Sequence, residues 1–297
     1  MRWFELLSPD HADRVSALLA AATAADGVAP VSEQAVLGLR GEGSSRHLLA
    51  LLGDEVAGYA SLTPAHGEHP AMAEAAVASA RRGRGIGRDL VAAALAAGGP
   101  GARIWAHGKL PAAEAVARRS GLAAVRELWQ LRRALATPEL PEVEVPAGIE
   151  VRTYAGPADD SELLRVNNAA FDWHPEQGGW SGSELAARRA ESWFDPAGLF
   201  LAFDARQPQR LLGFHWTKVH YDEDPPAGEV YVVGIDPTAQ GRGLGRLLTL
   251  IGLHHLRDAG LGEVLLYTEA DNTAAVRTYR GLGFAPAHID IAYSLPG

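Results

Sequence analysis

The chain has 297 residues, 47% of them hydrophobic, which predicts two domains of ordinary size. Its net charge of −9 at pH 7 argues against nucleic acid or an anionic membrane as the main partner, because both select basic surfaces. The absence of cysteine excludes disulfides and thiolate chemistry. Without a leader segment or a membrane-spanning apolar run, we expect a cytoplasmic monomer that acts on a small molecule.

In chain order, the two halves predict the same succession of elements, so the sequence contains a repeat. Each half begins with helical segments and continues with a hairpin, at 48–62 in the first half and 199–219 in the second. A longer strand, a glycine-rich turn, a helix, a strand, a second helix and a last strand follow. The strands and the first helix of this series are predicted in the second half at 229–236, 245–260, 263–269 and 287–295. This pattern indicates a mixed α/β fold.

The glycine-rich turns relate the two halves. Gly85 in RRGRGIG and Gly243 in AQGRGLG are 158 residues apart, and Arg82 and Gln240 keep the same offset. Between the halves, the prolines and acidic residues of TPELPEVEVPAG cannot hold a helix and predict an extended linker. We therefore expect a domain at 1–138, a linker at 139–148 and a domain at 149–297.

A glycine-rich turn that leads into a helix makes an anion site, because the first N–H groups of the helix are unpaired and carry the positive end of its dipole. A Walker loop would have Lys-Ser or Lys-Thr after its last glycine, where this chain has Arg246 and Leu247. A Rossmann motif would have another glycine spacing and an acidic residue at the end of the next strand. Neither nucleotide fold is supported.

The spacing Gln/Arg-x-x-Gly-x-Gly resembles the pyrophosphate loop of the GNAT acetyltransferase superfamily, which binds acetyl-coenzyme A. Further along, NTAAVRTYRGLGF is similar to the family's asparagine turn, tyrosine-bearing helix and terminal Gly-Phe. Together with the segment NNAAFDWHPEQGGW, the tandem halves resemble a two-domain GNAT family of actinobacteria. This resemblance covers nearly the whole chain. That family acetylates the cysteinyl amine of a cysteine–glucosamine–inositol conjugate, the last step in making mycothiol. The resemblance implies two tandem GNAT domains with mixed α/β sheets.

The resemblance also implies that acetyl-coenzyme A is the co-substrate, held by a strand with a bulge at VVGIDP, by the glycine-rich loop and by the asparagine turn. The contacts implied in the second half are Val233, Gly234, Ile235, Gln240, Gly241, Arg242, Gly243, Leu244, Gly245, Arg246, Asn272, Thr273, Ala274, Ala275, Val276 and Arg277. Those implied in the first half are Ala75, Ala76 and Val77 at its own bulge, with Arg82, Gly83, Arg84, Gly85, Ile86 and Gly87. There the coenzyme would bind without turnover.

Amide formation from a thioester needs a group that takes a proton from the amine and a group that gives one to the departing thiolate. By position alone, Glu229 is as well read as a solvated strand-end glutamate, and Tyr279 as an aromatic packed on the sheet. The resemblance assigns Glu229 as general base and Tyr279 as general acid. The repeat matches them with Ala71 and Ala117, so we expect only the second half to catalyse.

The resemblance implies that Glu33, Glu176, Lys218 and Tyr267 contact the sugar conjugate together with Glu229, in a pocket between the domains. Surface ion pairs are the alternative for Glu33 and Glu176. No metal is expected, because the histidines form no recognisable ligand pattern. The histidines considered are His174, His215, His254 and His255.

Two other functions remain open. Another GNAT enzyme would acetylate a different amine, such as an antibiotic, a polyamine or a protein N-terminus, and the fold alone does not separate these. A non-catalytic acyl-coenzyme A sensor would also fit a duplicated fold in which one half lacks the catalytic residues. The segment FDWHPEQGGW, rich in tryptophan and acid, favours the sugar conjugate, and the presence of both Glu229 and Tyr279 argues against a sensor.

Overall fold

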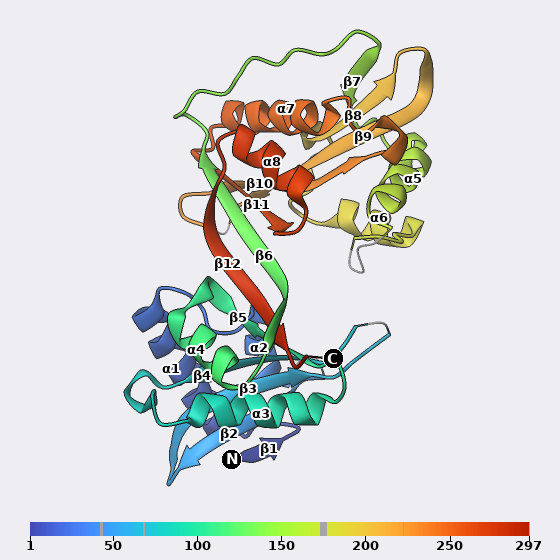
Figure 1. Ribbon diagram of the computed structural model, residues 1–297. Helices are drawn as coiled ribbons and strands as arrows, with labels where there is room; N and C mark the ends of the chain where they lie inside the picture. Colours follow the sequence, from blue (N-terminus) through green and yellow to red (C-terminus); the bar gives the residue numbers. More distant parts are fainter. Residues whose placement is uncertain (42–43, 68, 173–176, 222, 297) are drawn as a thin grey trace. The chain divides into compact units, whose positions relative to one another are not determined.

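The structure is a computed structural model that describes residues 1–41, 44–67, 69–172, 177–221 and 223–296. The chain folds into two compact units (Figure 1). The first unit is Met1–Leu128 with His288–Gly297, and the second is Trp129–Ala287. The sequence places one boundary at 139–148, whereas these units divide two strands, β6 (Ala123–Ala134) and β12 (Ala285–Ser294).

The first unit has a mixed sheet in the order β1-β2-β3-β4-β5-β12. Strands β4 and β5 are parallel and the other described pairs are antiparallel. Its elements are β1 (Arg2–Phe4), α1 (Pro9–Asp26), α2 (Glu33–Gly38), β2 (Arg46–Leu52), β3 (Glu55–Thr63), β4 (Met72–Val77), η1 (Ser79–Arg81), α3 (Ile86–Gly98), β5 (Arg103–Ala106), η2 (His107–Lys109), α4 (Pro111–Arg119) and the start of β6. The short strand β1 was not predicted.

The sheet of the first unit is covered on both faces because its strands are apolar at successive positions. Leu49 packs in one core cluster with Val15 and Leu19 of α1, whereas the preceding Leu48 packs in another with Leu90 of α3. Neighbouring residues of a strand point to opposite faces, so α1 and α3 lie on opposite sides. This explains why the strands read as continuous apolar runs.

The second unit repeats this plan with the order β6-β11-β10-β9-β8-β7, in which β10 and β11 are parallel. Its elements are the end of β6, β7 (Ile149–Thr153), η3 (Pro157–Asp159), α5 (Asp160–Ala170), α6 (Gly182–Ala190), η4 (Pro196–Gly198), β8 (Leu199–Asp204), β9 (Gln207–His220), β10 (Ala227–Ile235), η5 (Pro237–Ala239), α7 (Leu244–Asp258), β11 (Glu263–Glu269), α8 (Thr273–Gly281) and the start of β12. Leu199 packs with Leu163 of α5, and the following Phe200 packs with Leu247 of α7. The predicted mixed α/β fold is confirmed.

Each unit completes its sheet with a strand from the far end of the other half of the sequence. In the first unit, Ile291–Ser294 of β12 pair antiparallel with Arg103–Ala106 of β5. In the second unit, Leu131 of β6 is buried in a core cluster with Leu266. The sequence predicts that these strands exist, but not which sheet each one joins.

The proline-rich segment 139–148 holds neither helix nor strand, in keeping with its prolines. Its start is nevertheless fixed, because Leu140 is buried in the second unit and the Arg133 side chain donates to the Pro138 carbonyl oxygen. Among the described residues, no helix is long and apolar enough to span a bilayer.

Candidate functional site

A cavity of about 760 Å³ lies in the second unit, where β10 ends and α7 begins. The predicted coenzyme contacts that line it are Val233, Ile235, Gln240, Gly241, Gly243, Leu244, Gly245, Arg246, Asn272, Ala274 and Ala275. Tyr279, the predicted general acid, lines it too. The predicted contacts that are not among its lining residues are Gly234, Arg242, Thr273, Val276 and Arg277. Val276 is instead buried in the protein core.

The glycine-rich loop is shaped for a ligand rather than for packing. Gly241 and Gly243 have φ values of 77° and 78°, in the left-handed region that favours glycine, and a Cβ on either would meet no atom within 4 Å. Gly243 is the N-cap of α7 and offers no side chain to the first N–H groups of the helix. These amides can therefore bind an anion such as a diphosphate.

The bulge in β10 lies earlier than the resemblance implied. The register against β9 shifts between Val230 and Val232, which leaves Tyr231 as the extra residue, whereas the bulge was expected within VVGIDP. In the described residues, β10 pairs with β11 only at Gly228 and Glu229. Beyond this point the strand follows β9 alone, so the backbone near Val233 is left for the cavity.

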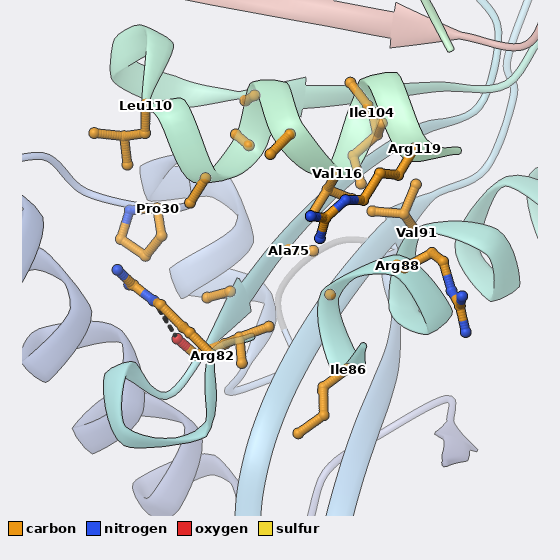
Figure 2. Close-up of a pocket in the computed structure, with 18 of the residues that line it drawn as sticks. Pro30, Ala75, Arg82, Ile86, Arg88, Val91, Ile104, Leu110, Val116 and Arg119 are labelled. Carbon is orange, nitrogen blue, oxygen red and sulfur yellow. Dashed lines mark hydrogen bonds between the residues drawn. The ribbon is translucent and has the colours of Figure 1, made fainter. Parts of the chain in front are cut away.

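A second cavity, of about 410 Å³, lies at the matching place in the first unit (Figure 2). Its lining includes the predicted contacts Ala75, Ala76, Val77, Arg82, Gly83, Gly85, Ile86 and Gly87, but not Arg84. The expected bulge is wrong for this half, because β3 and β4 pair without a register shift from Gly58 and Val77 to Thr63 and Met72. Strand β4 therefore has no extra residue corresponding to Tyr231 of β10.

Arg82 in the first cavity is held by the protein itself. Its guanidinium donates two hydrogen bonds to the Asp26 carboxylate, at 2.7 and 2.6 Å. Its Nε donates to the Val77 carbonyl oxygen, as the dashed line beside Arg82 in Figure 2 shows. The hydrogen bond to Arg82 lowers the pKa of Asp26 and outweighs the opposing effect of burial. Gln240, the residue at the matching position of the second half, carries no charge.

The bulge also changes how the two halves correspond. The constant offset of 158 matches Glu229 with Ala71. The same offset relates Val77 to Ile235, which pair with Gly58 on β3 and Gly213 on β9. Five residues further along these two strands, Thr63 lies opposite Met72 and Lys218 lies opposite Glu229. Met72 is therefore the counterpart of Glu229, and Ala71 was wrong by one residue. Neither side chain can carry a proton, so the first half still lacks this group.

Tyr279 and Ala117 do correspond. The backbone N–H of Phe284 donates to the Tyr279 carbonyl oxygen, just as that of Leu122 donates to Ala117. Tyr279 is partly buried beside Phe284, with ring centroids 5.7 Å apart. Burial raises the pKa of Tyr279 to about 12, so its hydroxyl keeps its proton at neutral pH. This is the state that a proton donor requires.

Glu229 is almost buried, 8% exposed, and does not line the cavity with Tyr279. Its Oε2 lies 2.7 Å from Nε2 of His220. Lys218, directly opposite on β9, places its ammonium 5.1 Å from the ring centroid of Trp193 and 5.8 Å from that of Tyr231. No local motif selects His220, which follows Lys218 by two residues and is recognisable only from the strand pairing.

The remaining predicted substrate contacts lie apart in the chain. Tyr267 on β11 is 52% exposed, and its hydroxyl accepts a hydrogen bond from Gln130 at 2.8 Å. Glu33 is exposed at the first position of α2, in the first unit. Glu176 lies outside the described residues. The contact of each with a substrate stays a prediction.

His215 in the second unit and a pair of histidines in the first unit have structural partners. The ring of His215 is buried and donates through Nδ1 to the Leu248 carbonyl oxygen, and burial lowers the pKa of His215 to about 4. In the first unit, His107 lies 2.8 Å from Glu74 and 3.1 Å from Asp290, which also contacts His288 at 2.7 Å. This hydrogen-bonded cluster was not predicted, because its members are far apart in the sequence. That no metal takes part stays a prediction.

The model of the acetyltransferase (GNAT) family matches residues 8–121 and 166–284. Mycothiol acetyltransferase of Nocardia farcinica is 73% identical over 297 residues, which cover 100% of this chain and 98% of that protein. Proteins of the same name from Rhodococcus jostii and Mycolicibacterium smegmatis are 62% and 56% identical, each over 98% of this chain and 97% and 98% of their own length. The similarity therefore extends through both units.

Solved structures share the fold at low sequence identity. A GCN5-related N-acetyltransferase from Sphaerobacter thermophilus has a TM-score of 0.71 at 22% identity and covers 98% of this chain and 94% of its own. A tandem GNAT protein from the clavulanic acid biosynthesis pathway has a TM-score of 0.65 at 19% identity, over 98% and 97% of the two chains. The predicted fold of two tandem GNAT domains is confirmed.

Proposed function

Because the chain belongs to the acetyltransferase (GNAT) family, we propose that it moves the acetyl group of acetyl-coenzyme A to the cysteinyl amine of a cysteine–glucosamine–inositol conjugate, giving mycothiol. One observation carries this choice of acceptor: relatives between 55% and 73% identical, aligned over nearly all of this chain, are named mycothiol acetyltransferase. We also propose that the protein acts as a monomer in the cytoplasm.

The coenzyme's diphosphate fits the loop of the second unit. Gly241 and Gly243 leave open space where a Cβ would stand, and the first amides of α7 face the cavity without a side-chain cap. Arg246, exposed in the first turn of α7, adds positive charge. Bound there, acetyl-coenzyme A supplies an activated acetyl group as a thioester. The backbone of β10 near Val233 then holds the arm of the coenzyme.

Glu229 and Tyr279 divide the two proton transfers between them. Glu229 accepts the proton of the incoming ammonium, directly or through water, and so provides the neutral amine that attacks the thioester. Tyr279 lines the coenzyme cavity in its protonated state and gives a proton to the departing thiolate. We assign Lys218, which lies opposite Glu229 on β9, and Tyr267, two residues after its β11 partner Leu265, to contacts with the acceptor. Contacts of Glu33 and Glu176 with the acceptor stay predictions.

The first unit keeps a coenzyme cavity but not the proton carriers. Its loop glycines Gly83 and Gly85 have φ values of 74° and 86°, as in the second unit. Met72 and Ala117 occupy the places of Glu229 and Tyr279. We assign it a binding role without turnover.

Mass spectrometry tests the proposed reaction. The purified protein is incubated with acetyl-coenzyme A and the cysteine–glucosamine–inositol conjugate, and in parallel with a polyamine, an aminoglycoside and a peptide with a free N-terminus. Acetylation of the conjugate in strong preference to the other amines supports the proposal. Preference for another amine identifies a different GNAT acceptor. Binding of coenzyme with no product from any amine indicates the sensor.

A further inference from the structure

The hydrogen bond between His220 and Glu229 is a built feature of the proposed active site. His220 is the last residue of β9, and its Nε2 lies 2.7 Å from Oε2 of Glu229. Both side chains are largely withdrawn from water, at 20% and 10% exposure. An ionised carboxylate only accepts hydrogen bonds, so Nε2 of His220 carries the hydrogen and donates it.

The other groups near Glu229 do not take this place. Lys218, opposite Glu229 on β9, directs its ammonium onto the rings of Trp193 and Tyr231. On β11, the residue paired with Glu229 is Leu265, which is buried and apolar. Within the described part of the chain, the side chain that pairs with Glu229 is thus that of His220.

This division of partners matters for a general base. A lysine bonded to the carboxylate would place a fixed positive charge on it and weaken its attraction for a proton. A histidine donor can hold the carboxylate in one orientation through a single ring N–H, without the compact ammonium charge of a lysine. The bond engages Oε2 and leaves Oε1 for the amine.

We infer that His220 is a positioning residue for acetyl transfer: its Nε2–H fixes the Glu229 carboxylate so that Oε1 meets the acceptor amine. The inference rests on the proposed role of Glu229 as the base. It predicts that the donor atom, rather than the aromatic ring, is what catalysis needs. A glutamine can place an amide N–H close to the position of Nε2, whereas phenylalanine has no donor and asparagine is too short to reach.

The experiment compares His220→Gln, His220→Phe and His220→Asn by kcat and by kcat/KM for the amine across pH. The Phe and Asn variants should lose about 10- to 100-fold in kcat, the range expected for a hydrogen bond to a charged group. His220→Gln should keep a kcat close to that of the unmodified enzyme, and coenzyme affinity should be unchanged in all three variants.

His254→Gln is the matched control, since its ring donates to the Pro141 carbonyl oxygen in the same unit, outside the cavity lining. If all three His220 variants match the unmodified enzyme while Glu229→Gln is inactive, the inference is wrong and the base assignment stands. If His220→Gln falls as far as His220→Phe, the donor role is wrong as well. A fully active Glu229→Gln overturns both the base and its positioning residue. His220→Asn keeps the test open where the Phe variant does not fold.

Discussion

Glu229 and Tyr279 are proposed to carry different protons, so their substitutions should differ in pH dependence. Removing a positioned proton-transfer group costs on the order of 10² to 10⁴ in rate, and we expect this loss in kcat for Glu229→Gln and for Tyr279→Phe at neutral pH. Rising pH deprotonates the amine in solution and should restore Glu229→Gln. It should not restore Tyr279→Phe, because the thiolate still lacks its donor. The measurement is kcat against pH.

Glu263→Gln provides the control for this pair, because that glutamate is on β11 and forms an ion pair with Arg132 away from the cavity lining. Coenzyme affinity, measured separately by titration, should hardly change in any variant. Near-normal kcat for Glu229→Gln across neutral pH would place the base elsewhere.

His107 gives the first unit a pH-dependent contact. Burial alone would lower the pKa of His107, but hydrogen bonds to Asp290 and Glu74 outweigh it and raise the pKa to about 9, from 6.5 for a free histidine. The stabilisation is complete below about pH 6.5, declines as pH rises and is lost above about pH 9, with an upper bound of roughly 3 kcal/mol. The free energy of unfolding should therefore fall over this range.

Urea unfolding at about pH 6, 8 and 10 checks this contribution. His107→Gln should be destabilised at the lowest pH and approach the unmodified protein at the highest. His11→Gln, a histidine of α1 in the same unit, is the control and should keep the unmodified pH dependence. A constant difference between His107→Gln and the unmodified protein at all three pH values would contradict the assigned protonation.

At the scale of elements, the two glycine-rich loops make a matched pair. Gly243 and Gly85 are the N-caps of α7 and α3, with φ values of 78° and 86°. Gly243→Glu should abolish acetyl transfer, because it places a side chain and a negative charge at the diphosphate site and strains the backbone. Gly85→Glu should leave most of the activity. Equal losses, with circular dichroism showing both variants folded, would contradict catalysis by the second unit alone.

The elements were predictable where local sequence decides them. The glycine loop, its helix and the hairpins follow from turn residues and periodicity, and all are observed at the expected places. The bulge at Tyr231 was misplaced, because a bulge depends on the register against β9 and not on β10 alone. The contact of His220 with Glu229 was missed for the same reason. Strand β1 was missed because three residues carry little periodicity.

At the scale of the whole molecule, the repeat predicts two domains but not how the last strands are shared. The alternation of AHIDIAYSL predicts a strand with one buried face, and that pattern would suit either sheet. In the structure, residues 291–294 are all buried. The structure joins Ile291 and its neighbours to β5 of the first unit and joins the end of β6 to the second unit. Composition predicts a linear division at 139–148, because prolines indicate where the chain is extended. It does not indicate which strands pair with one another.

Truncation of the C-terminus distinguishes this strand exchange from a linear division. A chain ending at Ala287 loses Ile291 and Tyr293, which are buried in the core of the first unit, and Asp290, which holds His107. Burial of a large apolar side chain contributes about 1.5 to 3 kcal/mol, so the loss approaches the whole stability of a domain. A chain ending at Ser294 keeps the complete strand and serves as the control.

Hydrogen exchange followed by mass spectrometry reads each unit separately. In the chain ending at Ala287, the amides of β5 and of the neighbouring β4 should lose their protection, while those of β10 and α7 in the second unit keep theirs. The chain ending at Ser294 should exchange like the full chain. A linear division makes the opposite forecast, because residues 288–297 would then belong to the domain that contains β10. Loss of protection confined to β10, β11 and α7 would thus refute the exchange of strands.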